Sequence, residues 1–311
     1  MKTPYSLIDI FLGYELIVSS RQASNQRKFI YNYSNKTGLV YACFIDNNDI
    51  RKESVVMLLA IDIGNTNVVI GCIRNESVLL SGRIISDHTF SCEEYSAEMK
   101  GILDAGNINM NEIEGSIISS VVPQLTNTLE RAVRELTNTT PVMVGPRLKT
   151  DLNLLIENPD QLGSDRIVDA AAAANYYGRP VIIIDMGTAT TISVVDENSN
   201  FLGGMIMPGV KSSLEALANR AAQLPHVKVN EAGNLIGRNT VECIQSGSIY
   251  GNAAMIDGIV RRLRKQIGQH ATVVATGGLS QLIVPHCDEE IIYDEHLLLK
   301  GLYLLFIKNN Q

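Results

Sequence analysis

The sequence lacks a hydrophobic run long enough to cross a bilayer. Polar and charged residues interrupt every apolar segment of the 311-residue chain, whereas a spanning helix needs about 18 to 20 apolar residues in succession. The residues before Met57 also lack the layout of a signal peptide. We therefore expect a cytoplasmic protein that has no membrane partner.

Paired cysteines and paired histidines are missing as well. The five cysteines are scattered and form no C-x-x-C pair, and the five histidines do not have the spacing of zinc ligands. These patterns argue against a disulfide framework and against a zinc site. Free thiols in a reducing compartment are the expected state.

The chain has fewer basic residues than acidic residues. The chain carries 26 Lys and Arg against 33 Asp and Glu, which gives a net charge of -7. No basic surface for nucleic acid is expected from this balance, and the basic run 261–265 is interpreted as the solvated end of a helix. A small anionic substrate would then need locally placed cations or backbone amides.

The composition that is present is that of a globular protein longer than one typical domain. Hydrophobic residues make up 45% of the chain and charged residues 19%, and a domain usually has about 100 to 200 residues. Residues 1–56 differ from the rest, because they are rich in Asn, Tyr, Ser and Lys and contain no recognisable motif. The sequence leaves open whether they are a genuine extension or an over-long reading frame before a native start at Met57.

From Met57 onward, apolar strand patterns alternate with helical ones, which predicts an α/β architecture. Strands are predicted at 58–63, 68–73, 115–119, 181–185, 191–195 and 272–276. Helices are predicted at 91–105, 124–137, 166–176, 212–220, 249–267 and 296–306. The break at 177–180, which contains Gly178 and Pro180, predicts a boundary between a domain of residues 57–176 and a domain of residues 177–311.

An internal echo links these two halves. The segment that begins Asp62-Ile63-Gly64 returns as Asp185-Met186-Gly187, in each case at the end of an apolar strand and before a second strand. Each segment therefore predicts a β-hairpin. Two similarly folded domains that face each other across a cleft are the expected arrangement.

The echoed loops have the composition of a phosphate cradle. In the first, a carboxylate is followed by Gly64, Asn65, Thr66 and Asn67, so that backbone N–H groups, an amide and a hydroxyl can face an anion. Mg²⁺ takes one or two carboxylates together with phosphate oxygens, which a single Asp beside such a loop supplies. The alternative for one loop alone is a hairpin turn with no ligand, and the duplication favours phosphate binding.

A third element extends the nucleotide interpretation. The strand that ends at Thr276 runs into Gly277-Gly278 and then into a short helical pattern, and such a turn lets a ribose or an adenine lie close to the backbone. Taken alone, this element is equally an ordinary strand-to-helix turn. Its place after the two phosphate loops favours a split nucleotide cleft.

These motifs, together with 163–166, 207–209 and 221–225, resemble the type III pantothenate kinase family over residues 57 to about 305. The resemblance implies two ribonuclease-H-like domains of the actin-like ATPase superfamily facing across a nucleotide cleft. It also implies ATP-dependent phosphorylation of pantothenate, the first step of coenzyme A biosynthesis, by a homodimer whose interface forms part of the substrate pocket. The helix predicted at 249–267 is the candidate contact.

The resemblance further implies roles for particular residues. Asp165 would be the proton acceptor, and Asp185 would bind a monovalent cation, K⁺ or NH₄⁺, while Mg²⁺ would accompany ATP. The implied substrate contacts are Gly163, Ser164, Asp165, Arg166 and Thr240. The implied ATP contacts are Asp62, Ile63, Gly64, Asn65, Thr66, Asn67, Val68, Val69 and Thr188.

Two other functions compete with this interpretation. A kinase for another small alcohol would share the ATP loops, and only residues 163–166 and Thr240 argue against it. A non-catalytic nucleotide-binding regulator would be expected to have lost its base. Asp165 and the two loop carboxylates are present, which favours catalysis.

Overall fold

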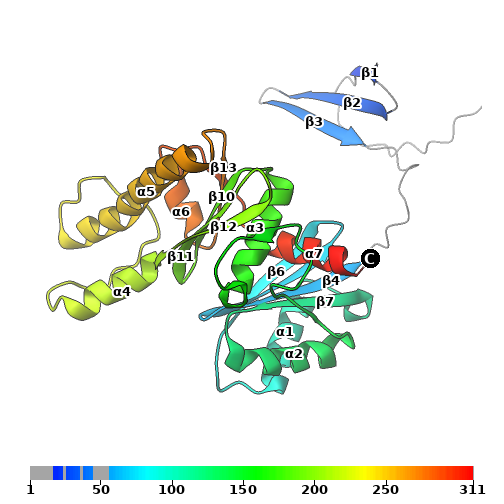
Figure 1. Cartoon of the computed structure of the whole chain (residues 1–311), viewed down its shortest axis with the longest axis horizontal. Coiled ribbons are helices and arrows are strands. Elements are labelled where there is room, and N and C mark those ends of the chain that lie inside the picture. Colours follow the sequence, from blue (N-terminus) through cyan, green and yellow to red (C-terminus); the bar gives the residue numbers. More distant parts are fainter. Residues whose placement is uncertain (1–16, 24–25, 36–37, 45–55, 311) are drawn as a thin grey trace, which may run out of the picture. The chain divides into compact units, whose positions relative to one another are not determined.

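The computed structural model describes residues 17–23, 26–35, 38–44 and 56–310 (Figure 1). The chain divides into two compact units, residues 1–54 and 55–311. In the first unit, three antiparallel strands form one sheet: β1 (Ile17–Ala23), β2 (Gln26–Asn35) and β3 (Gly38–Phe44). Sequence reasoning predicted no strands there, and a native start at Met57 stays a prediction.

The second unit contains two sheets that repeat one topology. In each, three antiparallel strands are followed by two strands parallel to the first. The first sheet has the order β6-β5-β4-β7-β8, from β4 (Met57–Ile63), β5 (Asn67–Arg74), β6 (Ser77–Ile85), β7 (Ile113–Ser120) and β8 (Val142–Met143). The second has the order β14-β13-β10-β11-β12-β9, from β9 (Asn153–Leu154), β10 (Val181–Met186), β11 (Ala189–Val195), β12 (Asn200–Pro208), β13 (Thr272–Thr276) and β14 (Ile292–Tyr293).

This repetition confirms the predicted fold class. Both echoed segments are hairpins, β4–β5 and β10–β11, and the shared strand order is that of two ribonuclease-H-like halves. The division between residues 57–176 and 177–311 stays a prediction, because residues 55–311 form one compact unit. Within the described residues, no helix is long and apolar enough to span a membrane.

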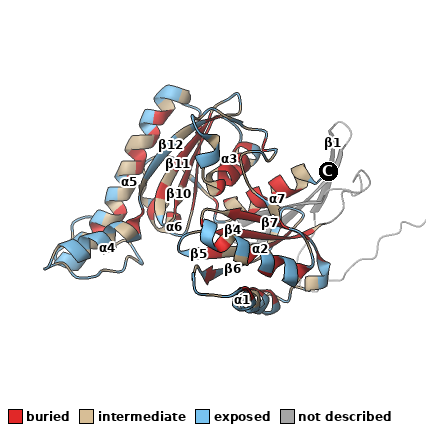
Figure 2. Ribbon diagram, turned by 60° about the horizontal axis from the view of Figure 1, so that its bottom comes forward, coloured by how far each residue is buried: buried red, intermediate tan, exposed pale blue. Residues whose placement is uncertain are grey.

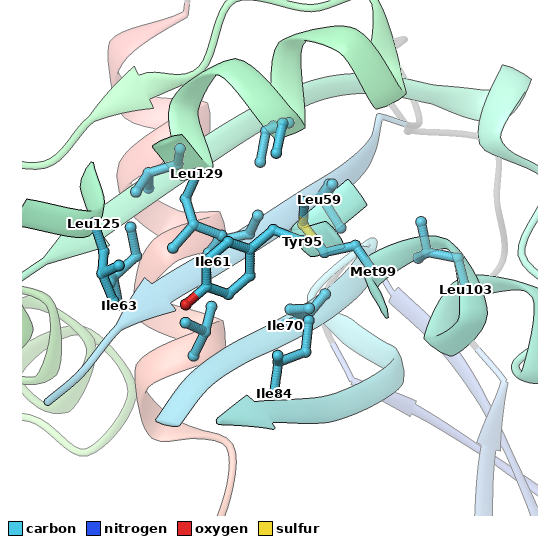
Figure 3. Close-up of a cluster of buried hydrophobic side chains, with 14 of the residues drawn as sticks. Leu59, Ile61, Ile63, Ile70, Ile84, Tyr95, Met99, Leu103, Leu125 and Leu129 are labelled. Atoms are coloured by element: carbon cyan, nitrogen blue, oxygen red, sulfur yellow. The ribbon is translucent and has the colours of Figure 1, made fainter. Parts of the chain in front are cut away.

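The helices cover the sheets on both sides. They are α1 (Cys92–Ala105), α2 (Pro123–Thr137), α3 (Ser164–Tyr176), α4 (Val210–Arg220), α5 (Thr240–Ile267), α6 (Ser280–Ile283) and α7 (Leu297–Asn309), with short 3₁₀ turns at Met110–Glu112, Pro159–Gln161 and Val284–His286. Helices α1 and α2 pack on one face of the first sheet around Leu59, Ile61, Tyr95, Met99 and Leu129 (Figure 3). The buried central strands of both sheets are visible in Figure 2.

Helix α3 lies between the two sheets (Figure 1). Its residue Val168 packs with Leu58 and Ile117 of the first sheet, while Ala173 belongs to the cluster of Val181 in the second. A run of five alanines, 170–174, keeps the helix narrow and has high helix propensity. Helix α3 is therefore held in place by both halves of the protein.

Sequence reasoning missed several features of this unit, among them the two-residue strands β8, β9 and β14. Strand β6 alternates exposed and half-buried residues, and β12 contains Gly203, Gly204 and Pro208, so that both have a weak strand pattern. Helix α5 begins at residue 240 and not at 249. The signal for this start is Asn239, whose side chain accepts the backbone N–H of Glu242 at 3.0 Å, which is an N-cap.

Candidate active site

Both hairpins, the first turns of α3 and the Gly-Gly turn surround one cavity of about 950 Å³. The structure thus brings together the carboxylates that the sequence singled out, Asp62, Asp165 and Asp185. Also lining the cavity are Gly64, Asn65, Thr66, Asn67, Val69, Gly187, Thr188, Thr276, Gly277 and Gly278. These segments lie more than 200 residues apart at their extremes, so only the fold makes them a site.

Six of the residues implied by the resemblance lie elsewhere. Ile63 and Val68 are buried in the first hydrophobic core. Asp165 lines the cavity, but its neighbours in the sequence, Gly163, Ser164 and Arg166, do not. Thr240 lines a separate cavity of about 740 Å³ between α4 and α5.

The two hairpin loops meet across the cavity. In the first, the N–H of Gly64 donates to the carbonyl of Asn67 at 3.0 Å, and in the second the N–H of Gly187 donates to the carbonyl of Ala189 at 3.0 Å. The hydroxyls of Thr66 and Thr188, one from each loop, are 2.8 Å apart. The loops are therefore tight turns whose hydroxyl groups face each other where a phosphate chain would pass.

The loop carboxylates are buried among like charges. Burial raises the pKa of Asp62 to about 7; a hydrogen bond donated by Ser119 at 2.7 Å opposes the shift, and Asp165 and Asp185 add to it. Burial likewise raises the pKa of Asp185 to about 7, with a further rise from Asp165 and a lowering by Arg83. Removing a carboxylate from water disfavours its charged form, and neighbouring carboxylates do the same.

Asp165 lies in the first turn of α3. Burial raises its pKa above the ordinary value, while the N–H of Arg166, which donates to Oδ1 at 2.8 Å, opposes the shift. A Cβ added to the preceding Gly163 would collide with the Asp165 carboxylate, with the Cγ of Asp165 at 3.6 Å. Glycine at 163 thus leaves room for the carboxylate to turn toward the cavity.

Asp169 is a site residue that sequence reasoning missed. It lines the cavity, is only 3% exposed, and its Oδ1 has no hydrogen-bond partner within the described part of the chain. Burial raises its pKa well above the ordinary value, with Asp185 and Asp165 as the largest electrostatic contributions. The sequence signal that could have revealed it is its position four residues after Asp165. Residues four apart share one face of a helix.

A buried serine network joins the first loop to α3. Ser119 donates to Asp62 and lies 3.0 Å from the hydroxyl of Ser164. Ser164 in turn accepts the backbone N–H of Ser120 at 2.9 Å and donates to its carbonyl at 2.9 Å. The side chain of Ser164 therefore fixes the start of α3 against β7, and through it the position of Asp165.

Arg166 binds the second sheet. Its Nε donates to the hydroxyl of Ser193 at 3.1 Å, Nη2 donates to the carbonyl of Ile192 at 3.3 Å, and the guanidinium lies over the ring of Phe201. Burial lowers its pKa, and Asp165 opposes that shift. In this position Arg166 anchors α3 on β11.

The donor set suits a hard cation. Asp62, Asp165, Asp169 and Asp185 all line the cavity, and the unpartnered Oδ1 of Asp169 is the kind of atom that a cation would satisfy. No group of three or more His, Cys, Asp or Glu side chains within the described residues forms a metal cage. The residues thus fit Mg²⁺, which usually takes one or two carboxylates and completes its shell with water and substrate phosphates.

The raised pKa values predict that the ligand-free protein loses stability as the pH rises from about 5 to about 7. Asp62 and Asp185 titrate near pH 7 when folded and near pH 4 when unfolded. In this window the folded state holds more protons, so the free energy of unfolding falls with increasing pH, by about 2 kcal/mol between pH 5 and pH 7 for one such carboxylate acting alone. The two carboxylates interact, so their effects do not add.

Urea unfolding at several pH values, without nucleotide or divalent ions, measures this effect. Asp185→Asn should flatten the slope, whereas Asp160→Asn, at an exposed position, should leave it unchanged. Stability that increases between pH 5 and pH 7 in the unaltered protein would contradict the assignment.

The comparisons with known proteins agree with this geometry. A family model described as type III pantothenate kinase matches residues 58–262. The chain belongs to the type III pantothenate kinase family. A type III pantothenate kinase of an Exiguobacterium species is 42% identical over 255 residues, which cover 82% of this chain and 100% of that protein. The corresponding kinase of Bacillus cytotoxicus is 40% identical over 253 residues, covering 81% and 97%.

The pantothenate kinase match contains most of the cavity wall. The loops of both hairpins, Asp165 and Asp169 all fall inside residues 58–262, and Gly277-Gly278 lies after the end of the match.

Among solved structures, a conserved putative Baf family transcriptional activator from Campylobacter jejuni superposes with a TM-score of 0.49 at 19% identity, covering 81% of this chain and 98% of that chain.

Proposed function

We propose that this protein transfers the γ-phosphate of ATP to pantothenate and forms 4'-phosphopantothenate, the first step of coenzyme A biosynthesis. Family membership supports the reaction class. The observation that carries the mechanism is the position of Asp165, at the end of a helix clamped between both sheets and beside the two hairpin loops.

Asp165 acts as the general base. The primary hydroxyl oxygen of the substrate bonds to the γ-phosphorus, the hydroxyl proton passes to the Asp165 carboxylate, and the bond to the β–γ bridging oxygen breaks with its electron pair leaving on ADP. Because burial raises the pKa of Asp165, its ionised form is a stronger proton acceptor than a carboxylate in water. Closure of the cavity around both substrates would exclude water that otherwise competes for the phosphoryl group.

The loops and carboxylates hold the phosphate chain. Backbone N–H groups and the hydroxyls of Thr66 and Thr188 supply donors to the phosphate oxygens, and Asp62 and Asp169 are positioned to hold Mg²⁺. When bound, Mg²⁺ neutralises charge on the phosphates. We assign Asp185 as the ligand of a monovalent cation, K⁺ or NH₄⁺, consistent with its burial among carboxylates.

A coupled ADP-release assay on the full chain tests this function. With Mg-ATP and pantothenate, we expect turnover that depends on pantothenate and is higher in K⁺ or NH₄⁺ than in Na⁺. Turnover with a different small alcohol, and none with pantothenate, would show that pantothenate is not the phosphate acceptor. ATP binding without turnover on any alcohol would favour the regulator interpretation over catalysis.

We further propose a cytoplasmic homodimer formed through the face that carries α4 and α5. Large apolar side chains are exposed on this face, among them Leu217 (43%), Leu235 (65%), Ile236 (81%) and Val241 (42%). They line or adjoin the second cavity, which contains Thr240. A surface of this kind is typical of an interaction site. In a dimer, Thr240 would complete the substrate pocket of the other subunit.

Mixing two inactive variants measures whether Thr240 acts across the interface. Asp165→Asn lacks the base and Thr240→Ala lacks the proposed substrate contact, but a mixed dimer regains one site with both groups intact if Thr240 acts on the other subunit. We expect activity to appear on mixing, and a dimer mass by light scattering. No recovery after subunit exchange, or a monomer, would contradict the shared site.

A further inference from the structure

Arg83 lies on the same row of the first sheet as Asp62. The antiparallel register pairs Asp62 of β4 with Val69 of β5, and Val69 with Arg83 of β6. Residues directly opposite on antiparallel strands project from the same face, and all three line the cavity. With neighbouring strands about 4.8 Å apart, Arg83 starts about 10 Å from Asp62 along this face.

The guanidinium of Arg83 reaches the second half of the protein. A Cβ placed on Gly278 would lie 3.3 Å from its Nη1 and 3.8 Å from its Nη2. Its positive charge also lowers the pKa of Asp185, against the effect of burial. The guanidinium therefore lies at the Gly-Gly end of the cavity, beside Gly278.

The cavity is short of positive charge. Six acidic side chains line it, Asp62, Asp165, Asp169, Asp185, Glu215 and Glu295, whereas Arg83 and Lys211 are the two Lys or Arg side chains among its described lining residues. Arg83 is exposed and makes no hydrogen bond or ion pair within the described part of the chain. A polyphosphate entering this cavity would therefore meet a cation that has not been neutralised by a protein partner.

We propose that Arg83 binds the β-phosphate of the nucleotide and stabilises the negative charge that forms on the leaving ADP. The inference rests on the proposed ATP-dependent kinase function. With the nucleoside at Gly277-Gly278 and the γ-phosphate at Asp165, the β-phosphate lies between them, on the side that Arg83 reaches. A guanidinium fork can donate to two phosphate oxygens at once.

This contact would strengthen during the reaction. As the bond to the γ-phosphorus breaks, negative charge accumulates on the bridging oxygen and the β-phosphate. A cation at that position binds the transition state more tightly than the ground state, which raises kcat as well as affinity. Arg83 would then affect both ADP affinity and turnover.

The second sheet provides a comparison for the position of Arg83. In the second sheet, the equivalent row runs from Asp185 to Thr191 and then to Ile206. Ile206 occupies the place of Arg83, is 68% exposed, and does not line the cavity. The repeated topology therefore does not require a cation at this position. For this reason we attribute Arg83 to ligand binding.

Binding of ATP, ADP and AMP to the full chain by calorimetry tests the proposal. For Arg83→Gln we expect the Kd of both ATP and ADP to rise about 10- to 100-fold, the loss of a charge-assisted hydrogen bond, while the Kd of AMP stays unchanged. The kcat should fall further. Arg83→Lys should recover part of the affinity, and Arg131→Gln, which removes an exposed arginine of α2, is the matched control.

Three outcomes would overturn the proposal. Affinity for ATP, ADP and AMP could fall equally, or it could stay unchanged for all three nucleotides. Affinity could also fall for ATP alone, which would place Arg83 at the γ-phosphate. Failure of the proposed function is distinguishable, because these measurements need no pantothenate. If pantothenate is not phosphorylated but Arg83→Gln weakens ADP and not AMP, the acceptor assignment fails and the role of Arg83 stands.

Discussion

Asp165→Asn lowers kcat by about 10²- to 10⁴-fold, the usual contribution of a general base, and leaves the Kd of ATP nearly unchanged. The substitution removes the proton acceptor but keeps the shape of the side chain and the amide oxygen that can accept the N–H of Arg166. It also relieves repulsion in the carboxylate cluster, because Asp165 raises the pKa values of Asp62 and Asp185. The variant should therefore fold at least as well as the unaltered protein.

Steady-state kinetics and calorimetry together measure this result. In the unaltered enzyme, the acidic limb of the kcat profile should lie above the pH at which an ordinary Asp titrates, because the pKa of Asp165 is raised. Asp160→Asn provides a control on an exposed carboxylate. Collapse of nucleotide affinity with kcat preserved would remove Asp165 from the role of base.

Gly277→Ala should weaken nucleotide binding and lower the melting temperature. Gly277 has φ of 89°, where an L-residue costs about 1 to 2 kcal/mol. A Cβ there would also lie 2.6 Å from the backbone N of Met186 and would collide with the Asp185 carboxylate. Because a backbone atom of a central strand cannot move aside, the turn itself must shift. We expect a rise of more than about tenfold in the Kd of ATP and a Tm lower by about 5 to 10 °C.

Gly101→Ala is the matched control for this substitution. Gly101 lies in α1, and no atom outside its own helical turn lies within 4 Å of an added Cβ. Alanine is the better helix former, so this variant should be more stable by about 0.5 to 1 kcal/mol. Thermal unfolding and calorimetry compare the pair. Unchanged ATP affinity in Gly277→Ala would exclude the Gly-Gly turn from the nucleotide site.

The parts of the site that sequence could predict are those with local signals. The duplicated hairpins follow from apolar strands that end at Asp62 and Asp185, since a carboxylate followed by glycine marks a turn wherever it occurs. Asp165 was found because it stands between the two loops in a distinctive motif. These features depend on neighbours in the chain, which a sequence displays directly.

The parts that sequence did not predict depend on pairing between distant segments. Arg83 joins Asp62 only through the register of three strands, and β6 itself has a weak strand pattern. Asp169 lies in an otherwise apolar stretch of α3, and its spacing of four residues from Asp165 was the one signal available in the sequence. Thr240, an implied substrate contact, lines a separate cavity between α4 and α5, and no local sequence pattern shows that it lies apart from the other site residues.

The position of α3 has a consequence for the timing of catalysis. The helix packs on both sheets, so a rotation of one sheet relative to the other displaces the end of the helix that carries Asp165. A movement that narrows the cavity around the nucleotide would then also move the proposed base. If that movement requires bound alcohol, we expect hydrolysis of ATP without alcohol to be slow.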